Sequence, residues 1–287
     1  RVADHLRRNH STLRSEAPRN PTTPRGSIVL AVAVNPSPHA TRQIRRWLRP
    51  VKQRWITRDP VAFSEKVQYK MARDRRPLIV TFADKLSARV YVEACGTGCQ
   101  LTKLYAVGSD LAEVDRSSLP REFVVKVTHA SGGVVLVSEM ASRSARTPTP
   151  AEGLVRKLVH PDVLDWSQLE TTVRAWLTTT YEGPFGEWAY TQVTPQVMVE
   201  ELLSHRGKLP TDYKFWVFHG HCRVVELAID RFGKLTELMF TPSWELLPDL
   251  PGDEEAAMHI QPQPPAKLDA MISTAERLGR DTDFVRV

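Results

Sequence analysis

One cation and a small flexible turn stand close together near the middle of the chain. Lys126 lies near the end of the apolar run Phe123–Val127, and the turn Ser131–Gly133 follows a few residues later. A second apolar run, Val134–Val137, begins directly after the turn. Backbone amides of a glycine-rich turn, together with a nearby lysine, are suited to binding phosphate oxygens. The stretch therefore predicts two strands joined by a phosphate-binding turn.

The alternation of side chains along the first strand decides where its lysine points. Successive strand residues face opposite sides, which puts Phe123, Val125 and Val127 on one face and Val124, Lys126 and Thr128 on the other. Lys126 is thus expected outside the apolar stripe. Taken alone, this window also fits a lysine on the wet face of an edge strand that enters an ordinary hairpin turn.

A second lysine stands at the start of a predicted helix. Asp84 is expected to cap this helix, which carries Leu86, Val90, Tyr91 and Ala94 on one side. Lys85 then falls in the first turn, where a positive charge opposes the helix dipole. Its position indicates a purpose other than helix stability.

Other chemistry-bearing residues give weaker signals. The C-x-x-x-C spacing of Cys95 and Cys99 fits either a metal site or, because no second pair is nearby, a glycine-rich connector. His219, His221 and Cys222 fit either zinc or a polar turn. The adjacent Glu200 and Glu201 are doubtful as an acid and base pair, because neighbouring strand residues point to opposite faces.

These residues are distributed over a chain with short helical and strand patterns. Helices are expected over Phe63–Met71, from a capping box at Ser167–Glu170 through Leu177, and over Leu268–Leu278. Short strands are expected at Leu78–Phe82, Leu101–Val107, Val197–Leu203, Phe215–Phe218, Val224–Ile229, Thr236–Phe240 and Phe284–Val287. The mixture predicts an α+β fold.

Charge and composition separate the N-terminal part from the rest. The chain has 287 residues and a net charge of +6, and the positive excess lies in residues 1–58, where Asp4 and Glu16 are the acids. This Pro- and Arg-rich extension is expected to be poorly ordered, and it is either a solvated tail or a contact to an anionic surface. The apolar run Ile28–Val34 is far too short to span a bilayer, and three cysteines do not make a disulfide framework. We expect a cytoplasmic protein without a transmembrane segment and without specific nucleic-acid binding.

The ordered set of motifs resembles the ATP-grasp superfamily, and within it the TupA-like branch associated with teichuronopeptide and cell-surface polysaccharide assembly. The similarity runs from about Phe63 to Val287, and its pieces in order are FADKLSARVYV, LPREFVVKVTHASGG, GEWAY, VMVEELL, DYKFWVFHG, AIDRF, SWELL and FVRV. The resemblance implies an ATP-grasp fold in which two α+β lobes with antiparallel sheets grip the nucleotide. It also implies a segmentation into 1–58, an N-terminal lobe segment 59–84, a central subdomain 85–205 and an incomplete C-terminal subdomain 206–287.

The resemblance also implies roles for individual residues. Lys85 and Lys126 match the two lysines that contact nucleotide phosphates in this superfamily. The loop Thr128–Gly133 would fold over the phosphates; its candidate contacts are His129, Ser131, Gly132 and Gly133. The Glu201 carbonyl and the Leu203 amide would hold adenine, with Glu200 beside them. Asp212 matches the ribose-binding acid, while Lys214 and Arg231 match further phosphate or acyl-phosphate contacts.

The implied activity is an ATP- and Mg²⁺-dependent ligation of a carboxylate to an amine through an acyl phosphate. The carboxylate would belong to a small molecule or a surface-polymer precursor. The family's usual magnesium-binding carboxylates are expected beyond Val287, which leaves Asp230 as a weak metal candidate. Two other functions remain open: a glycosyl or phosphoryl transferase of the same pathway, and a degenerate module that binds nucleotide or polymer without catalysis.

Overall fold

The computed structural model describes residues 60–183, 186–205, 207–229, 235–247 and 262–287. The chain divides into two units between Asp74 and Arg75. The basic extension 1–58 lies outside the described residues. The segmentation expected at residues 84 and 205 stays a prediction.

The described part of the first unit is one helix, α3 (Phe63–Arg73). The Glu65 carboxylate accepts hydrogen bonds from the Val61 and Ala62 amides, both at 3.0 Å, and so satisfies backbone donors at the start of the helix. Lys70 pairs with Asp74 one turn later, at 2.7 Å. The helix predicted in this region is confirmed.

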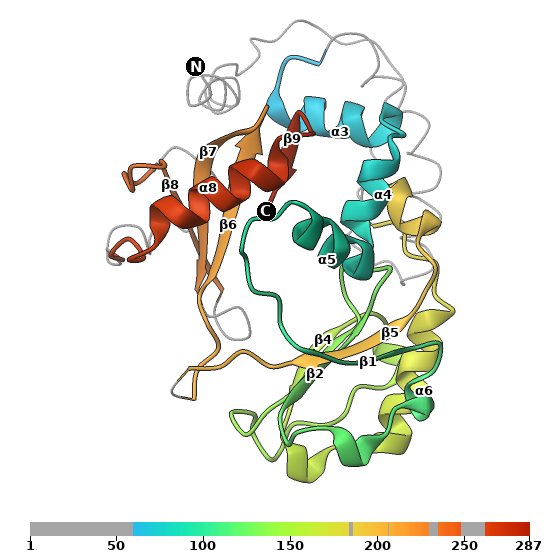
Figure 1. Cartoon of the computed structure of the whole chain (residues 1–287). Coiled ribbons are helices and arrows are strands. Elements are labelled where there is room, and N and C mark those ends of the chain that lie inside the picture. The colour runs from blue at the N-terminus through green and yellow to red at the C-terminus, as the bar shows by residue number, and fades with distance from the viewer. Residues whose placement is uncertain (1–59, 184–185, 206, 230–234, 248–261) are drawn as a thin grey trace, which may run out of the picture. The chain divides into compact units, whose positions relative to one another are not determined.

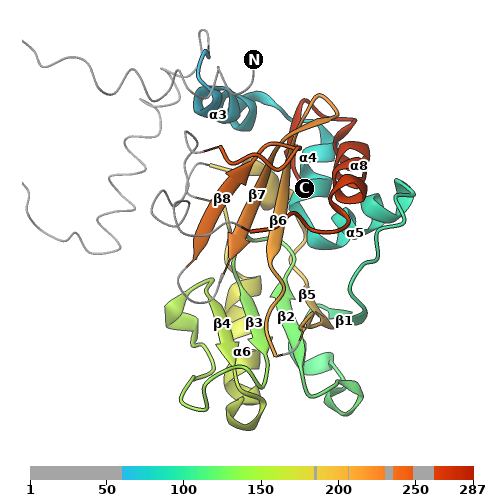
Figure 2. The same cartoon turned by 90° about the vertical axis from the view of Figure 1, so that its left-hand side faces the viewer.

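The second unit contains a five-stranded mixed sheet, called the first sheet below. Its strands are β1 (Leu104–Gly108), β2 (Phe123–Val127), β3 (Val134–Val137), β4 (Arg156–Val159) and β5 (Val197–Glu201). They lie in the order β1-β5-β2-β3-β4, which can be followed across the sheet in Figure 2. The neighbours pair antiparallel except β3 and β4, which are parallel. The predicted strand, turn and strand around Ser131 are confirmed as β2 and β3.

One face of the first sheet is covered by α6 (Trp166–Leu177), which packs Leu169, Val173 and Trp176 against it. Figure 1 shows this helix beside the strands. The sheet residues in the same apolar cluster include Phe123, Val125 and Val127, which confirms the predicted alternation of β2. The predicted start of α6 was two residues late: the side chain of Asp165 caps the helix by accepting from the Gln168 amide at 2.9 Å.

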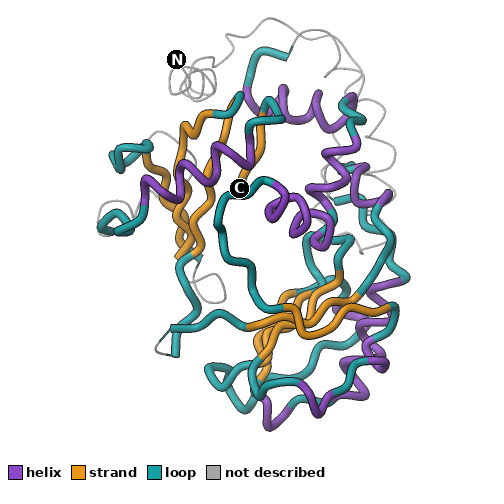
Figure 3. Tube along the Cα trace, in the orientation of Figure 1, coloured by secondary structure: helices purple, strands orange, loops and turns teal. Residues whose placement is uncertain are grey.

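Two short helices precede the first sheet: α4 (Pro77–Ala83) and α5 (Lys85–Ala94). The strand expected at Leu78–Phe82 is wrong, because this run forms α4. Periodicity cannot separate a short apolar strand from a partly buried helix, and Pro77 at the first helical turn favours the helix. The long loop that leads from α5 to β1 is drawn in teal in Figure 3.

A four-stranded antiparallel sheet, called the second sheet, completes this unit. Its order is β8-β7-β6-β9, with β6 (Asp212–Phe218), β7 (His221–Ile229), β8 (Thr236–Phe240) and β9 (Phe284–Arg286). Helix α8 (Leu268–Gly279) contributes Ala275, Met271 and Ile272 to the apolar cluster formed with these strands. Two sheets, each with its own helix, confirm the α+β class.

Short 3-10 helices occupy several connections, at Leu111–Glu113, Arg116–Ser118, Pro150–Glu152, Pro161–Val163 and Trp188–Gln192. Every helix in the described part of the chain is too short or too polar to cross a membrane.

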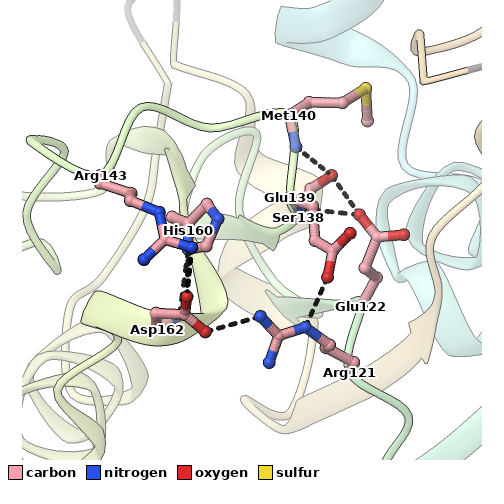
Figure 4. A network of polar contacts seen from close by, with 8 residues as sticks. All are labelled: Arg121, Glu122, Ser138, Glu139, Met140, Arg143, His160 and Asp162. Atoms are coloured by element: carbon pink, nitrogen blue, oxygen red, sulfur yellow. Dashed lines mark hydrogen bonds and ion pairs between the residues drawn. The ribbon is translucent and has the colours of Figure 1, made fainter.

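An exposed ionic network lies at the end of the first sheet where β2 begins and β3 and β4 end (Figure 4). Arg121 donates to Glu139 at 2.5 Å and to Asp162 at 2.6 Å, and Arg143 pairs with the same aspartate at 2.7 Å. Beside it the Glu122 carboxylate accepts from the Ser138 hydroxyl. The turn Ser131–Gly133, which joins β2 to β3, lies at the opposite end of these strands.

Candidate nucleotide-binding site

The site begins with a buried ion pair on the first sheet. Lys126 lies opposite Met198 on the neighbouring strand β5, and Val124 lies opposite Glu200, so the lysine and the glutamate are diagonal neighbours on one face. The Lys126 Nζ donates to Glu200 Oε1. The Glu200 side chain is 6% exposed and the Lys126 side chain 30%. The lysine therefore lies on the face away from α6, as the alternation predicts.

Helix α5 brings two more cations to this cluster. Its residues Lys85 and Arg89 are four positions apart and so share one side of the helix. Arg89 Nη1 lies 3.3 Å from Glu200 Oε2, and the Thr102 hydroxyl donates to the same oxygen at 2.9 Å. Asp84 caps α5 as predicted, by accepting from the Leu86 and Ser87 amides. The cap and the four-residue spacing position both cations.

Lys85 contacts the loop Thr128–Gly133. Its Nζ donates to the Ala130 carbonyl at 2.5 Å, and its backbone amide lies 3.4 Å from the Thr128 carbonyl. Burial, followed by repulsion from Lys126 and Arg156, lowers the pKa of Lys85 to about 8. Because burial and neighbouring cations disfavour the charged form of Lys85, a bound anion would stabilise it, and a polyphosphate would supply that anion.

The glycines of the loop are required by close packing. A Cβ at Gly132 would lie 2.1 Å from the Leu154 carbonyl oxygen, and Gly133 has a φ of +66° with Val127 2.6 Å from the position of a Cβ. Ser131 is the exposed residue of the loop, and Arg156 at the start of β4 donates to its carbonyl. The loop is thus a packed turn with one exposed tip beside a third cation.

The histidine of the loop turns towards α6. His129 is 2% exposed, and its Nε2 lies 3.1 Å from the Thr179 carbonyl. Burial lowers its pKa, although the hydrogen bond to Thr179 opposes this shift. A nucleotide contact through its side chain stays a prediction.

The residues predicted to hold adenine lie at the end of β5. Glu201 is its last residue; its amide donates to the Lys103 carbonyl at 2.8 Å, and its carboxylate accepts from the Lys103 amide at 3.1 Å. Leu203 is 52% exposed two residues further on. Both main-chain contacts to adenine remain predictions, whereas the Glu200 side chain belongs to the ionic cluster.

The second sheet holds a similar cluster. Lys214 lies directly opposite Glu226 and donates to its Oε1. Trp216 Nε1 donates to Glu226 Oε2 at 2.8 Å, and Arg286 Nη1 lies 3.4 Å from the same oxygen. Burial would raise the pKa of Glu226, but the hydrogen bonds from Lys214 and Trp216 and the charge of Arg286 bring it below its ordinary value. Asp212 is more distant, at 4.0 Å from the Lys214 Nζ.

The predicted metal ligand Asp230 and the predicted phosphate contact Arg231 lie outside the described residues. Within the described ranges, no group of three or more His, Cys, Asp or Glu side chains could hold a metal ion. Magnesium prefers carboxylate and phosphate oxygens, yet both oxygens of Glu200 and of Glu226 already face cations. These two carboxylates therefore do not fit Mg²⁺ as they stand.

The structure brings Lys85, Lys126 and Glu200 together beside the loop, and it places Asp212 4.0 Å from Lys214. The charged residues Arg89, Arg156, Glu226 and Arg286 of these clusters were not predicted. The four-residue spacing from Lys85 was a signal for Arg89, and a carboxylate inside the apolar strand at Glu226 was a signal for burial. Arg156 had no local signal, because it reaches the loop through the parallel pairing of β4 with β3.

Comparison with known proteins agrees with this arrangement. The family model described as TupA-like ATPgrasp matches residues 65–287. The searches of curated proteins and of solved structures found no match. The family match covers most of the chain and includes both lysines, the loop and both clusters. The chain belongs to the TupA-like ATP-grasp family.

Proposed function

We propose that this chain is an ATP-dependent ligase that joins a carboxylate to an amine. The observation that carries the proposal is the convergence of Lys85 and Lys126, from separate elements, beside the loop Thr128–Gly133. Arg156 adds a third positive charge near the same loop. Membership of an ATP-grasp family supports ATP as the source of the phosphate.

The reaction would proceed in two steps. An oxygen of the substrate carboxylate attacks the γ-phosphorus of ATP, the bond to the β-phosphate oxygen breaks, and ADP leaves. The amine nitrogen then attacks the carbonyl carbon of the acyl phosphate, inorganic phosphate leaves, and the nitrogen loses a proton. Phosphoryl transfer depends mainly on positioning and charge stabilisation. Lys85 and Lys126 would provide both at the triphosphate.

The second sheet supplies further candidates for the transferred group. Lys214 and Arg286 share the buried Glu226, and Arg286 is the more exposed of the two cations. Arg286 would hold phosphate or acyl-phosphate oxygens. Members of ATP-grasp families generally use Mg²⁺ with ATP. Because Glu200 and Glu226 are already paired with cations, each step is assigned to the cations of the chain. The pathway we propose is assembly of a cell-surface polysaccharide or peptide polymer.

Trapping with hydroxylamine tests the reaction class without knowledge of the natural amine. The protein is incubated with ATP, Mg²⁺, hydroxylamine and single amino acids or sugar acids as carboxylates. A ligase forms a hydroxamate and ADP in equal amounts, and only when the correct carboxylate is present. Lys126→Met should abolish the product, while Lys157→Met is the matched control, since Lys157 pairs with Glu152 at 2.6 Å. Consumption of a nucleotide sugar without ADP, or failure to bind ATP at all, would contradict the proposal.

A further inference from the structure

Glu200 has an unusual position for an acid beside a phosphate site. Its carboxylate is almost completely buried, and it is bonded to the lysine that the proposed function assigns to phosphate. A phosphate and this carboxylate would compete for the same ammonium group. The same acid also faces a second cation, Arg89, on its other oxygen.

The two cations differ in how firmly they are held. Arg89 contacts Glu200 Oε2 and the Thr102 hydroxyl through Nη1, at 3.3 and 3.0 Å, and the Thr102 carbonyl through Nη2, at 2.5 Å. Lys126 contacts the acid through one flexible ammonium group, and its side chain is the more exposed, at 30% against 19%. Arg89 is therefore the fixed partner, and Lys126 is the partner that can turn to a ligand.

Burial explains why a fixed partner is needed. A buried carboxylate that loses its only counter-charge is strongly unfavourable. If Lys126 were the only cation on Glu200, its movement to a phosphate would leave that charge uncompensated. With Arg89 and Thr102 on Oε2, the acid stays paired while Oε1 releases the lysine.

We infer that Glu200 is an internal counter-anion that competes with nucleotide phosphate for Lys126, and that Arg89 is the positioning residue that allows the exchange. The inference rests on the proposed function, because it requires a polyphosphate at Lys126. Arg89 acts through Glu200 and does not touch the nucleotide. Glu200 neutralises the lysine when the site is empty and yields it when ATP binds.

The inference predicts a pattern that a purely structural role does not. Arg89→Gln leaves Lys126 as the only cation on Glu200, so ATP should bind about tenfold more weakly or worse, as expected for a charge-assisted contact. Glu200→Gln removes the competitor, so ATP should bind as tightly as to the wild type or more tightly. The double variant should recover the affinity of Glu200→Gln to within about threefold, because Arg89 has no task once the acid is gone.

Titration calorimetry with ATP and, separately, with inorganic tripolyphosphate measures these affinities. Tripolyphosphate has no adenine and reports on the phosphate site alone. Arg174→Gln is the matched control: this arginine on α6 pairs with Asp110 at 2.6 Å and is 51% exposed, so its loss should leave binding unchanged. Arg89→Lys keeps the charge and should retain most of the affinity, which guards against a folding defect in Arg89→Gln. Thermal unfolding of each variant verifies the fold.

The outcomes separate the inference from the proposed function. Rescue of Arg89→Gln by Glu200→Gln supports the inference. Unchanged affinity in Arg89→Gln, additive losses in the double variant, or tenfold weaker binding in Glu200→Gln would overturn it while leaving the nucleotide site in place. A wild-type protein that binds neither ATP nor tripolyphosphate would overturn the proposed function, and this inference with it.

Discussion

The two sheets of the second unit carry the same ionic arrangement. In each sheet, Oε1 of a buried glutamate accepts a hydrogen bond from a lysine. Its Oε2 accepts a hydrogen bond from a neutral donor and lies close to an arginine. Glu200 has Lys126, Arg89 and Thr102, whereas Glu226 has Lys214, Arg286 and Trp216. The exposed cation differs between them. On the first sheet it is the lysine, at 30% against 19%, and on the second it is the arginine, at 52% against 15%.

The difference in exposure indicates which cation is available to a ligand. The buried cation of each cluster stays bonded to the glutamate and mainly holds that glutamate in place. The exposed cation can leave the glutamate and bind a substrate oxygen instead. By this comparison, Lys126 would face a ligand on the first sheet and Arg286 on the second. Lys214, expected from the resemblance to contact phosphate, would then hold Glu226 in place.

The largest expected effect on stability is at Glu226. Glu226→Ala leaves Lys214 without its closest anion in a buried setting, and loss of one partner of such a pair costs about 3–5 kcal/mol of unfolding free energy. Denaturant unfolding measures the loss. Glu237→Ala is the control; this acid lies 3.7 Å from Lys214 but is 40% exposed, so we expect less than about 1 kcal/mol. Glu200→Ala should cost less unfolding free energy than Glu226→Ala, because Lys126 can reach water. An equal or larger loss would contradict this difference between the two sheets.

In the described part of the chain, the loop Thr128–Gly133 of the first sheet has no counterpart in the cluster of the second sheet, and we expect it to tolerate no side chain at Gly132. Gly132→Ala places a Cβ against the backbone carbonyl of Leu154, and we expect about 1–3 kcal/mol of destabilisation. Gly153→Ala adds only the strain of a positive φ, because nothing lies within 4 Å of its added Cβ. A melting temperature of Gly132→Ala equal to that of the wild type would show that the loop is not tightly packed.

The pH dependence of nucleotide binding should identify Lys85. Its pKa is lowered to about 8, so above that pH the free protein must take up a proton to present the charged amine. ATP affinity is expected to fall by up to about tenfold per pH unit above pH 8. Between pH 8 and 10.5 the Lys85 amine is protonated in the unfolded chain but mostly neutral in the folded one. Because the unfolded state binds more protons there, this group makes the unfolding free energy rise with pH across that window. Lys85→Met should lose this component of the binding profile; identical slopes in both proteins would contradict the assignment.

The smallest effect is expected in the exposed network of Figure 4. Arg121 is 55% exposed although it pairs with both Glu139 and Asp162. Surface ion pairs contribute about 0–1 kcal/mol, so Arg121→Ala should change unfolding free energy by less than about 1 kcal/mol and leave ATP binding intact. A loss of unfolding free energy comparable to that of Glu226→Ala would mean that solvent exposure does not determine how much these ion pairs contribute to stability.

Local patterns predicted the parts of this molecule that depend on neighbours in sequence. Alternation placed Lys126 off the apolar face, and Asp84 marked the start of α5. The run Leu78–Phe82 was misread as a strand because a short apolar segment suits either structure when it is covered on several sides. Arg156 and Arg286 were missed because they reach their partners through the pairing of β4 with β3 and of β9 with β6, which no local pattern reports. Glu226 was missed although its partner Lys214 lies on the adjacent strand β6, because the carboxylate inside this apolar strand was not interpreted as the partner of a lysine. The family resemblance supplied the roles of Lys85 and Lys126 that spacing alone left open.

The affinity of ATP for Lys126→Met is the most direct measurement of the central claim, that the cations around the loop Thr128–Gly133 bind the nucleotide's phosphates. Calorimetry should show binding roughly tenfold to a hundredfold weaker than in the wild type, the range for loss of a charge-assisted contact. Lys157→Met should bind ATP as the wild type does. If Lys126→Met and Lys157→Met bind ATP equally well, the phosphate site does not lie at Lys126 and the account is contradicted.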